Sequence, residues 1–197
     1  MKFRMLTWIT AMTLFAALAM PVRIVAQEQE QQKAVKMTFS GTSAPSTVNL
    51  LQPDTSNDED NWAGTGTLGS FTVRNVRAIA NSPTPSSTCS GPNLLHFTEP
   101  AGGGVFRFQD GSLLNLHLTQ GDDCIDLLAD DAHCTVTFQI TGGTGRFKNA
   151  SGTLTFTEAV APVLADTSGN PVFFAATGEY TGTVSGVSEE HGQDGGQ

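Results

Sequence analysis

Apolar and polar residues alternate along much of the chain. From Cys134 to Thr141 every second residue is apolar, and threonine or glutamine fills the positions between. The same period of two returns from Thr153 to Glu158. This period is typical of β-strands that have one apolar and one polar face. Gly142, Gly143 and Gly145 lie between the two stretches, so we expect the central hairpin of the fold here.

Six further segments are strand-like. They cover residues 34–41, 71–76, 93–99, 104–110, 112–119 and 172–185. We expect 93–99 and 104–110 to pair as a hairpin, and the tight-turn sequence Asp110-Gly111 to return 112–119 beside 104–110. No helical crossover separates these segments, and closure would remove the edge strands. The sequence predicts an all-β fold, a single antiparallel up-and-down β-barrel of about eight strands.

Three polar segments are expected to lie outside the strands. The first is an acidic loop with Asp54, Asp58, Glu59 and Asp60, where a solvated loop and a calcium site are the alternatives. The ordered spacing of a calcium loop is absent there. Residues 120–131 are expected to hold one short helical turn, and residues 161–171 a long turn.

The N-terminal segment has a different composition. Lys2 and Arg4 precede an apolar run over residues 5–20, and the segment ends at the small residue Ala26. This is the pattern of a secretory signal peptide, and the run is short of the ~20 apolar residues of a membrane span. Cleavage after Ala19 is the alternative. We expect a signal peptide at 1–26, a flexible leader at 27–33, a barrel domain at 34–186 and a disordered tail at 187–197, in a secreted or periplasmic protein.

The net charge of the chain limits the classes of partner that we expect it to bind. Ten basic and nineteen acidic residues give a net charge of -9, and removal of residues 1–26 takes away three basic residues and no acid, which leaves -12. Such a chain repels phosphate backbones, so nucleic acid is not an expected partner. No basic amphipathic helix favours an anionic membrane surface. The twenty-one glycines fit the all-β class.

Three cysteines in an exported chain allow one disulfide and leave one thiol. Cys124 and Cys134 are close in sequence, and we expect this pair; Cys89 with either of them is the main alternative. Zinc binding by Cys124, His133 and Cys134 is a further alternative, but their spacing matches no familiar zinc finger. We predict no metal site and no cofactor.

The sequence ITGGTGRF, from Ile140 to Phe147, resembles the turn signature of the allene oxide cyclase barrel-like and dirigent-like family, particularly its exported bacterial relatives. The segments 64–72 (GTGTLGSFT) and 178–183 (GEYTGT) look like the same group's pattern. The resemblance implies a small barrel that holds one small ligand. Plant members cyclise a fatty-acid epoxide or steer the coupling of phenolic radicals, and they form trimers, which makes a homo-oligomer an expectation here. No plant catalytic residue can be matched to a position in this chain.

The glycines of this signature also have a direct physical role. Gly142, Gly143 and Gly145 allow backbone angles that other residues avoid in a tight connection. Arg146 and Phe147 are expected to pin the turn by a polar contact and an apolar anchor. A phosphate-binding loop is the alternative, but no Lys-Ser or Lys-Thr follows at the required spacing. We therefore predict a structural turn.

Several polar residues share the apolar phase of their strands. Glu158, Glu99 and Tyr180 are the catalytic candidates, because a carboxyl beside an apolar cavity has a raised pKa and serves as a general acid or base. The candidates for ligand binding are Phe138, Leu154, Phe156, Phe97, Phe108 and Phe174. The alternative is that the carboxyls lie in water past the strand ends or pair with Arg77, Arg107 or Arg146. His96 and His117 fall on the polar phase and are expected at the surface.

Three functions follow from this pattern. The leading one is an exported barrel that binds a small apolar or aromatic ligand without catalysis. The second is an isomerase or cyclase that uses an interior carboxylate. The third is a structural barrel of the cell envelope whose interior is filled by side chains.

Overall fold

The computed structural model describes residues 32–126, 128–129 and 131–188, so the predicted signal peptide lies outside the described residues. Within them, the only helix is one 3-10 turn, η1 (Gly145–Phe147). The strands are β1 (Lys33–Pro45), β2 (Thr55–Gly66), β3 (Phe71–Ala80), β4 (Leu94–Thr98), β5 (Ala101–Phe108), β6 (Leu113–Asp126), β7 (Asp131–Gly143), β8 (Ser151–Ala165) and β9 (Pro171–Ser185). No helix among these residues is long and apolar enough to cross a membrane.

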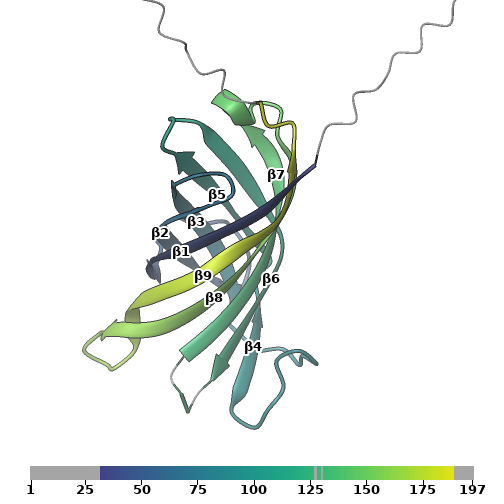
Figure 1. Cartoon of the computed structure of the whole chain (residues 1–197). Coiled ribbons are helices and arrows are strands. Elements are labelled where there is room, and N and C mark those ends of the chain that lie inside the picture. The colour runs from purple at the N-terminus through teal and green to yellow at the C-terminus, as the bar shows by residue number, and fades with distance from the viewer. Residues whose placement is uncertain (1–31, 127, 130, 189–197) are drawn as a thin grey trace, which may run out of the picture.

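The strands form a closed antiparallel barrel. With β4 left aside, each strand pairs with the next along the chain, so β3 pairs with β5. The pairing of β9 with β1 and that of β6 with β7 complete the ring. Eight strands make the barrel, and β4 is an extra strand beside β6. Figure 1 shows η1 at one end of the barrel and β4 reaching past the other. The predicted all-β barrel of about eight strands is confirmed.

The predicted hairpin between 93–99 and 104–110 is wrong. β4 and β5 follow each other along β6 in a single register, with Leu94 opposite Asp126 and Gly103 opposite His117. Pro100 interrupts the ladder between them because it has no N–H to donate. Gly103 lies in β5, opposite His117 of β6. Glycine suits this position, because a Cβ would press on the carbonyl oxygen of Leu116. The glycines that suggested a turn therefore serve close strand contact.

Three strands extend into segments that the sequence predicts to be loops or turns. The expected acidic loop is most of β2, and Asp60 on it is fully buried. The expected helical turn near Ile125 is the end of β6, and the long turn expected after residue 160 begins only beyond Ala165, where β8 ends. In β2 the side chains that point inward include carboxylates, so the period of two does not show as a hydrophobic alternation.

The η1 end of the barrel is closed by packed side chains. Phe106 lies 4.9 Å from both Phe71 and Tyr180, measured between ring centroids, and Phe147 packs on Phe108 at 4.7 Å. Arg146 holds the turn in place, because its Nη2 donates to the carbonyl oxygen of Leu68 at 2.5 Å.

The glycines of this turn have the backbone that the sequence suggested. Gly142 and Gly145 have positive φ angles of 104° and 58°, which favour glycine. Gly143 has no room for a side chain beside the carbonyl oxygen of Leu113. The Arg146 guanidinium also lies 3.0 Å from a carboxylate oxygen of Asp110. This segment therefore acts as a structural closure of the η1 end.

The disulfide joins Cys89 to Cys124, so the predicted Cys124–Cys134 pair is wrong. Cys124 lies opposite His133 on β7, and Cys134 lies opposite Asp123 on β6. Neighbouring positions of a strand point to opposite faces, so the two cysteines point to opposite sides of the barrel wall. Cys134 is buried as a free thiol.

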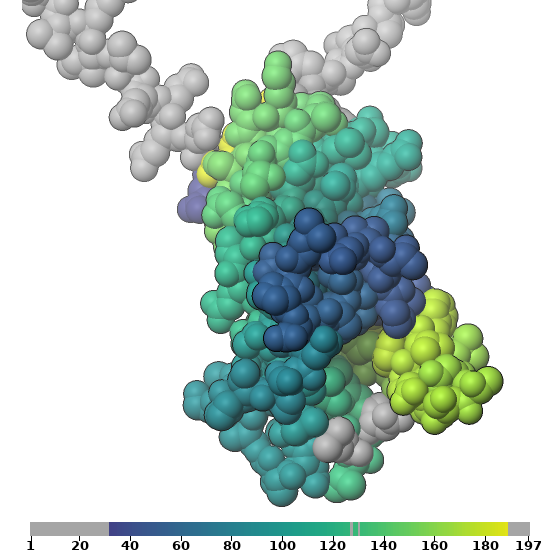
Figure 2. Space-filling model, turned by 180° about the vertical axis from the view of Figure 1, so that it is seen from behind, coloured from purple at the N-terminus to yellow at the C-terminus, as the bar shows by residue number. Residues whose placement is uncertain are grey.

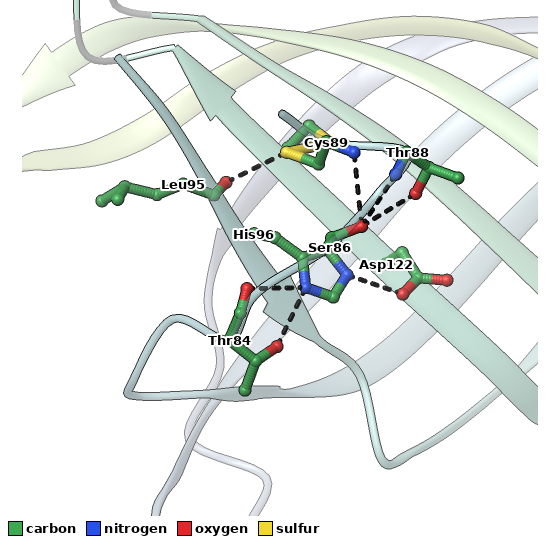
Figure 3. The surroundings of a disulfide bond; sticks show 8 residues. Thr84, Ser86, Thr88, Cys89, Leu95, His96 and Asp122 are labelled. Atoms are coloured by element: carbon green, nitrogen blue, oxygen red, sulfur yellow. Dashed lines mark hydrogen bonds and ion pairs between the residues drawn. A yellow bond between two sulfur atoms is a disulfide. The ribbon is translucent and has the colours of Figure 1, made fainter. Parts of the chain in front are cut away.

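The disulfide holds the segment before β4 against the outer wall (Figure 3). His96 lies under this segment, 8% exposed, with Nε2 at 2.8 Å from an Asp122 oxygen and Nδ1 at 2.9 Å from the Thr84 hydroxyl. The expectation that His96 lies at the surface is therefore wrong, because a loop covers this part of the outer face. His117 is exposed, as expected.

Candidate functional site

A buried arginine organises the half of the interior that lies toward β4. Arg77 on β3 donates from Nε to Asp60 at 2.9 Å and from Nη2 to the other oxygen of that carboxylate at 3.1 Å. Its Nη1 donates to Glu99 at 2.6 Å, and Nη2 also reaches Glu158 at 3.4 Å. Asp123 lies 4.0 Å from Nη1. Four carboxyls from four separate parts of the barrel wall thus surround one guanidinium, and we call these five residues the Arg77 cluster.

Strand pairing explains how residues so distant in sequence meet. Asp123, Cys134 and Glu158 occupy paired positions on β6, β7 and β8, and all three turn inward. Glu99 sits at the interruption between β4 and β5. Gly121 on β6 makes room for it, because a Cβ at Gly121 would collide with the Glu99 side chain.

Burial controls the protonation of these carboxyls. It raises the pKa of Glu158 to about 8, although Arg77 acts in the opposite direction. Burial also raises the pKa of Glu99 well above its usual range, and the neighbouring Asp123 raises it further. Asp58 stands beside the cluster, and burial raises its pKa to about 6. Both glutamates therefore keep their protons to a higher pH than an exposed glutamate does.

A cavity of about 330 Å³ opens between the Arg77 cluster and the β4 end of the barrel. Its polar floor includes Arg77, Asp123 and Asp58. Its walls are mostly apolar and are formed by Ile79, Phe97, Ile125, Ala132, Val160 and Phe174. The volume is at the small end of the ~300–1,000 Å³ typical of small-molecule sites. In Figure 2, the segment near residue 50, the segment before β4 and the β8–β9 turn gather around this end.

Several polar atoms in this region lack a hydrogen-bond partner. They are Asp123 Oδ1, Glu99 Oε2 and Glu158 Oε1, and each belongs to a residue that is less than 5% exposed. Buried polar atoms without partners are rare in folded proteins, because each loses its hydration without a replacement. Cys134 also lines the cavity, and burial raises the pKa of its thiol well above the usual range. The thiol therefore stays protonated.

The structure divides the three catalytic candidates. Glu158 and Glu99 lie in the Arg77 cluster, behind the residues that line the cavity. Their pairing with Arg77 was one of the alternatives that the sequence left open. Tyr180 lies apart from them, fully buried among aromatic rings, and its hydroxyl accepts a hydrogen bond from Asn75 at 3.1 Å. Burial raises the Tyr180 pKa well above its usual range, so the hydroxyl remains neutral.

The ligand-binding candidates are divided in the same way. Phe97 and Phe174 line the cavity. Phe138, Leu154, Phe156 and Phe108 belong to the packed core, at most 3% exposed. A ligand-binding role for all six stays a prediction, and two of them stand where a ligand could touch them.

The sequence analysis placed Asp58 and Asp60 in an acidic loop, gave Asp123 no role, and named Arg77 as one of three possible partners for the carboxyls. A usable signal was present: Val73, Asn75 and Arg77 are in phase on β3. Hydrophobic periodicity assigns charged residues to the exterior, so it does not identify Arg77 as an interior residue. In the described part of the chain, no three His, Cys, Asp or Glu residues are arranged to hold a metal ion.

Comparison with known proteins gives a likeness of fold alone. No family model matches the chain, and no curated protein matches it. Among solved structures, a pterocarpan synthase dirigent protein is similar, with a TM-score of 0.40 and 11% identity, over 81% of this chain and 87% of that chain. At this TM-score and identity, only the residues of this chain indicate what its cavity does. The resemblance to allene oxide cyclases stays a prediction.

Proposed function

We propose that this protein binds one small organic molecule in the cavity at the β4 end of its barrel. The observation that carries this proposal is the contrast within the cavity, where apolar walls lead to a floor of buried charged and polar groups. Such a site takes an apolar body and fixes its orientation through a few polar contacts. The unpartnered carboxyl oxygens near the floor support it, because a bound molecule would supply the missing partners.

A purely structural barrel is less well supported. The η1 half of the interior is filled by aromatic and aliphatic side chains, as a structural role requires. The β4 half retains a cavity beside buried carboxyls, an arrangement that stabilises nothing by itself.

A pair of tryptophan substitutions tests the proposal. Val160 lines the cavity, whereas Val163 on the same strand is 54% exposed. Ligand-observed NMR with ethylbenzene, phenethyl alcohol and phenethylamine would measure binding. We expect at least one probe to bind the wild type and Val163→Trp, and Val160→Trp to lose it because the indole occupies the cavity. Absence of binding by all three probes, or unchanged binding to Val160→Trp, would contradict the proposal.

A second candidate function is an isomerase or cyclase that uses an interior carboxyl. The observation that favours it is Glu158, whose pKa of about 8 allows it both to hold and to release a proton near neutral pH. Glu158→Gln should then abolish turnover of a bound substrate while affinity is retained. Turnover that survives this substitution would exclude Glu158 as the acid or base.

We also propose that the chain is exported. The Cys89–Cys124 disulfide supports this, because such bonds persist mainly in oxidising compartments. Fractionation of the native host, with the thiol state of each cysteine determined by mass spectrometry, would test it.

A further inference from the structure

The floor of the cavity carries more acid than base. Within the described residues, Asp58 and Asp123 line the floor, Asp60, Glu99 and Glu158 lie just behind it, and the one cation among these five carboxyls is Arg77. The Asp60 carboxylate accepts two hydrogen bonds from Arg77, and its negative charge balances that of the guanidinium. Among the described residues that line the cavity, Arg77 is the only cation, so the other carboxyls have no second positive charge beside them.

Arg77 offers little to an anionic ligand. Four of its five N–H groups already donate to carboxyls of the cluster, and Asp123 lies 4.0 Å from Nη1, which carries the fifth. A ligand carboxylate or phosphate would have to displace one of them and would also face the remaining acids. An anion is therefore disfavoured here, although an arginine lines the cavity.

The unpartnered atoms of this region are carboxyl oxygens, and each is an acceptor once its carboxyl has lost its proton. Asp123 is 4% exposed, lines the cavity, and has one carboxyl oxygen without a hydrogen-bond partner. Glu99 and Glu158, just behind it, each have another. An ammonium group carries three donors and no acceptor, so it complements this set. Asp58 faces the same cavity and adds a fourth carboxyl that attracts a cation there.

We infer that the ligand is a compact organic cation, with a protonated amine at the Asp123 and Asp58 side of the floor and an apolar body against Phe97 and Phe174. This inference rests on the proposed binding function and names the ligand class for it. The two phenylalanine rings suit the apolar body, and aromatic faces also attract a nearby ammonium ion.

Proton release is a consequence of this assignment. In the empty site Glu99 and Glu158 hold their protons to a higher pH than exposed glutamates do, because burial raises their pKa values. An ammonium ion that arrives beside them favours ionisation, so a carboxyl proton leaves to solvent as the cation enters. A neutral ligand of the same shape would release none.

Three probes of one shape separate the possibilities on the full-length mature protein. Phenethylamine, phenethyl alcohol and phenylacetate carry a cationic, a neutral and an anionic head on the same body. Isothermal titration calorimetry at neutral pH, in two buffers of different ionisation enthalpy, gives both affinity and protons released. We expect phenethylamine to bind at least about tenfold more tightly than phenethyl alcohol, as for one added hydrogen bond to a charged group. We also expect it to release protons, and phenylacetate to bind most weakly.

Two substitutions locate the effect. Asp123→Asn should remove most of the preference for the amine over the alcohol, whereas Asp54→Asn should leave it unchanged, because Asp54 is exposed in the turn before β2. If Asp123→Asn does not fold, the three-probe comparison on the wild type still decides. Equal affinity for the amine and the alcohol, or amine binding without proton release, would overturn the cation assignment and leave the binding function standing. Absence of binding by every probe would overturn both.

Discussion

The two ends of the barrel are built by the same strands and differ in what those strands turn inward. At the η1 end, the inward residues are aromatic or aliphatic, and Phe106, Leu114 and Phe138 are fully buried. At the β4 end, the inward residues include Arg77 and Asp123 beside a cavity. The first end stabilises the fold by removing apolar area from water. The second holds desolvated charges whose attraction is offset by lost hydration, so it adds little net stability.

This contrast shows how one barrel separates a packed end that stabilises the fold from an end that keeps a cavity. Phe156 marks the boundary, since its ring packs against Tyr180 and also lies 5.3 Å from the Arg77 guanidinium. On the η1 side of Phe156 the interior is filled. On the β4 side, polar residues stand beside a cavity that apolar side chains would have filled.

The largest effect is expected from removal of the central cation. Arg77→Met leaves the buried carboxyls without their partner, and we expect a loss of about 5 kcal/mol in the free energy of unfolding, the upper end for a broken buried ion pair. Arg74→Met is the matched control on the same strand, because Arg74 pairs with Glu59 but its side chain is 61% exposed. We expect it to leave the urea midpoint nearly unchanged. Similar losses for the two variants would contradict the buried role of Arg77.

A phenylalanine from each end sharpens the comparison. Phe106→Ala should cost about 4 kcal/mol, within the range for a fully buried ring that leaves a cavity. Phe97→Ala should cost less than half as much, because Phe97 is only partly buried and already borders empty space. Urea denaturation of both variants measures the difference. Equal losses would mean that the two ends are packed alike.

The disulfide makes a separate contribution on the outer wall. Replacing Cys89 and Cys124 together with serine should reduce the free energy of unfolding by about 3–4 kcal/mol, as the loop-closure model gives for this separation of 35 residues. Cys134→Ser should keep the disulfide. Thiol labelling after denaturation without reductant, followed by peptide mapping, should modify Cys134 alone. Labelling of Cys89 or Cys124 instead would show a different pairing.

The smallest expected effect is the change in the free energy of unfolding per pH unit. Glu158 has its pKa raised from 4.5 to about 8, and Asp58 from 3.8 to about 6. The native state thus holds protons that the unfolded chain has lost. Stability is highest below the unfolded pKa values and falls as pH rises toward about 8, by up to about 1.4 kcal/mol per pH unit for each group.

Urea denaturation at several pH values between about 5 and about 8 checks this dependence, because the two pKa shifts define this range. Glu158→Gln should flatten the decline, because the glutamine does not titrate. Glu179→Gln is the control, since Glu179 lies on the neighbouring strand and pairs with the exposed Lys36. A stability that rises over this range would contradict the raised pKa values.

Much of the barrel could be predicted, because its apolar alternation is local. Val136, Phe138 and Ile140 were placed inside by period alone, and the Asp110-Gly111 turn joins β5 to β6 as expected. Prediction failed where polar residues turn inward, as at Asp60, and where glycines serve close strand contact, as at Gly103. In both cases the residue type indicates a loop, and only its neighbours across the sheet make it a strand residue.

The sequence by itself determined the all-β class, the hairpin from β7 to β8 and the turn at η1, because these depend on neighbours a few residues apart. It also indicated that Glu99 and Glu158 share the apolar phase of their strands. Only the tertiary structure decided that these two meet Arg77 and that Cys124 bonds to Cys89. Both outcomes depend on register between strands and on which face each residue takes. A shift of one residue reverses that face, and no local pattern records it.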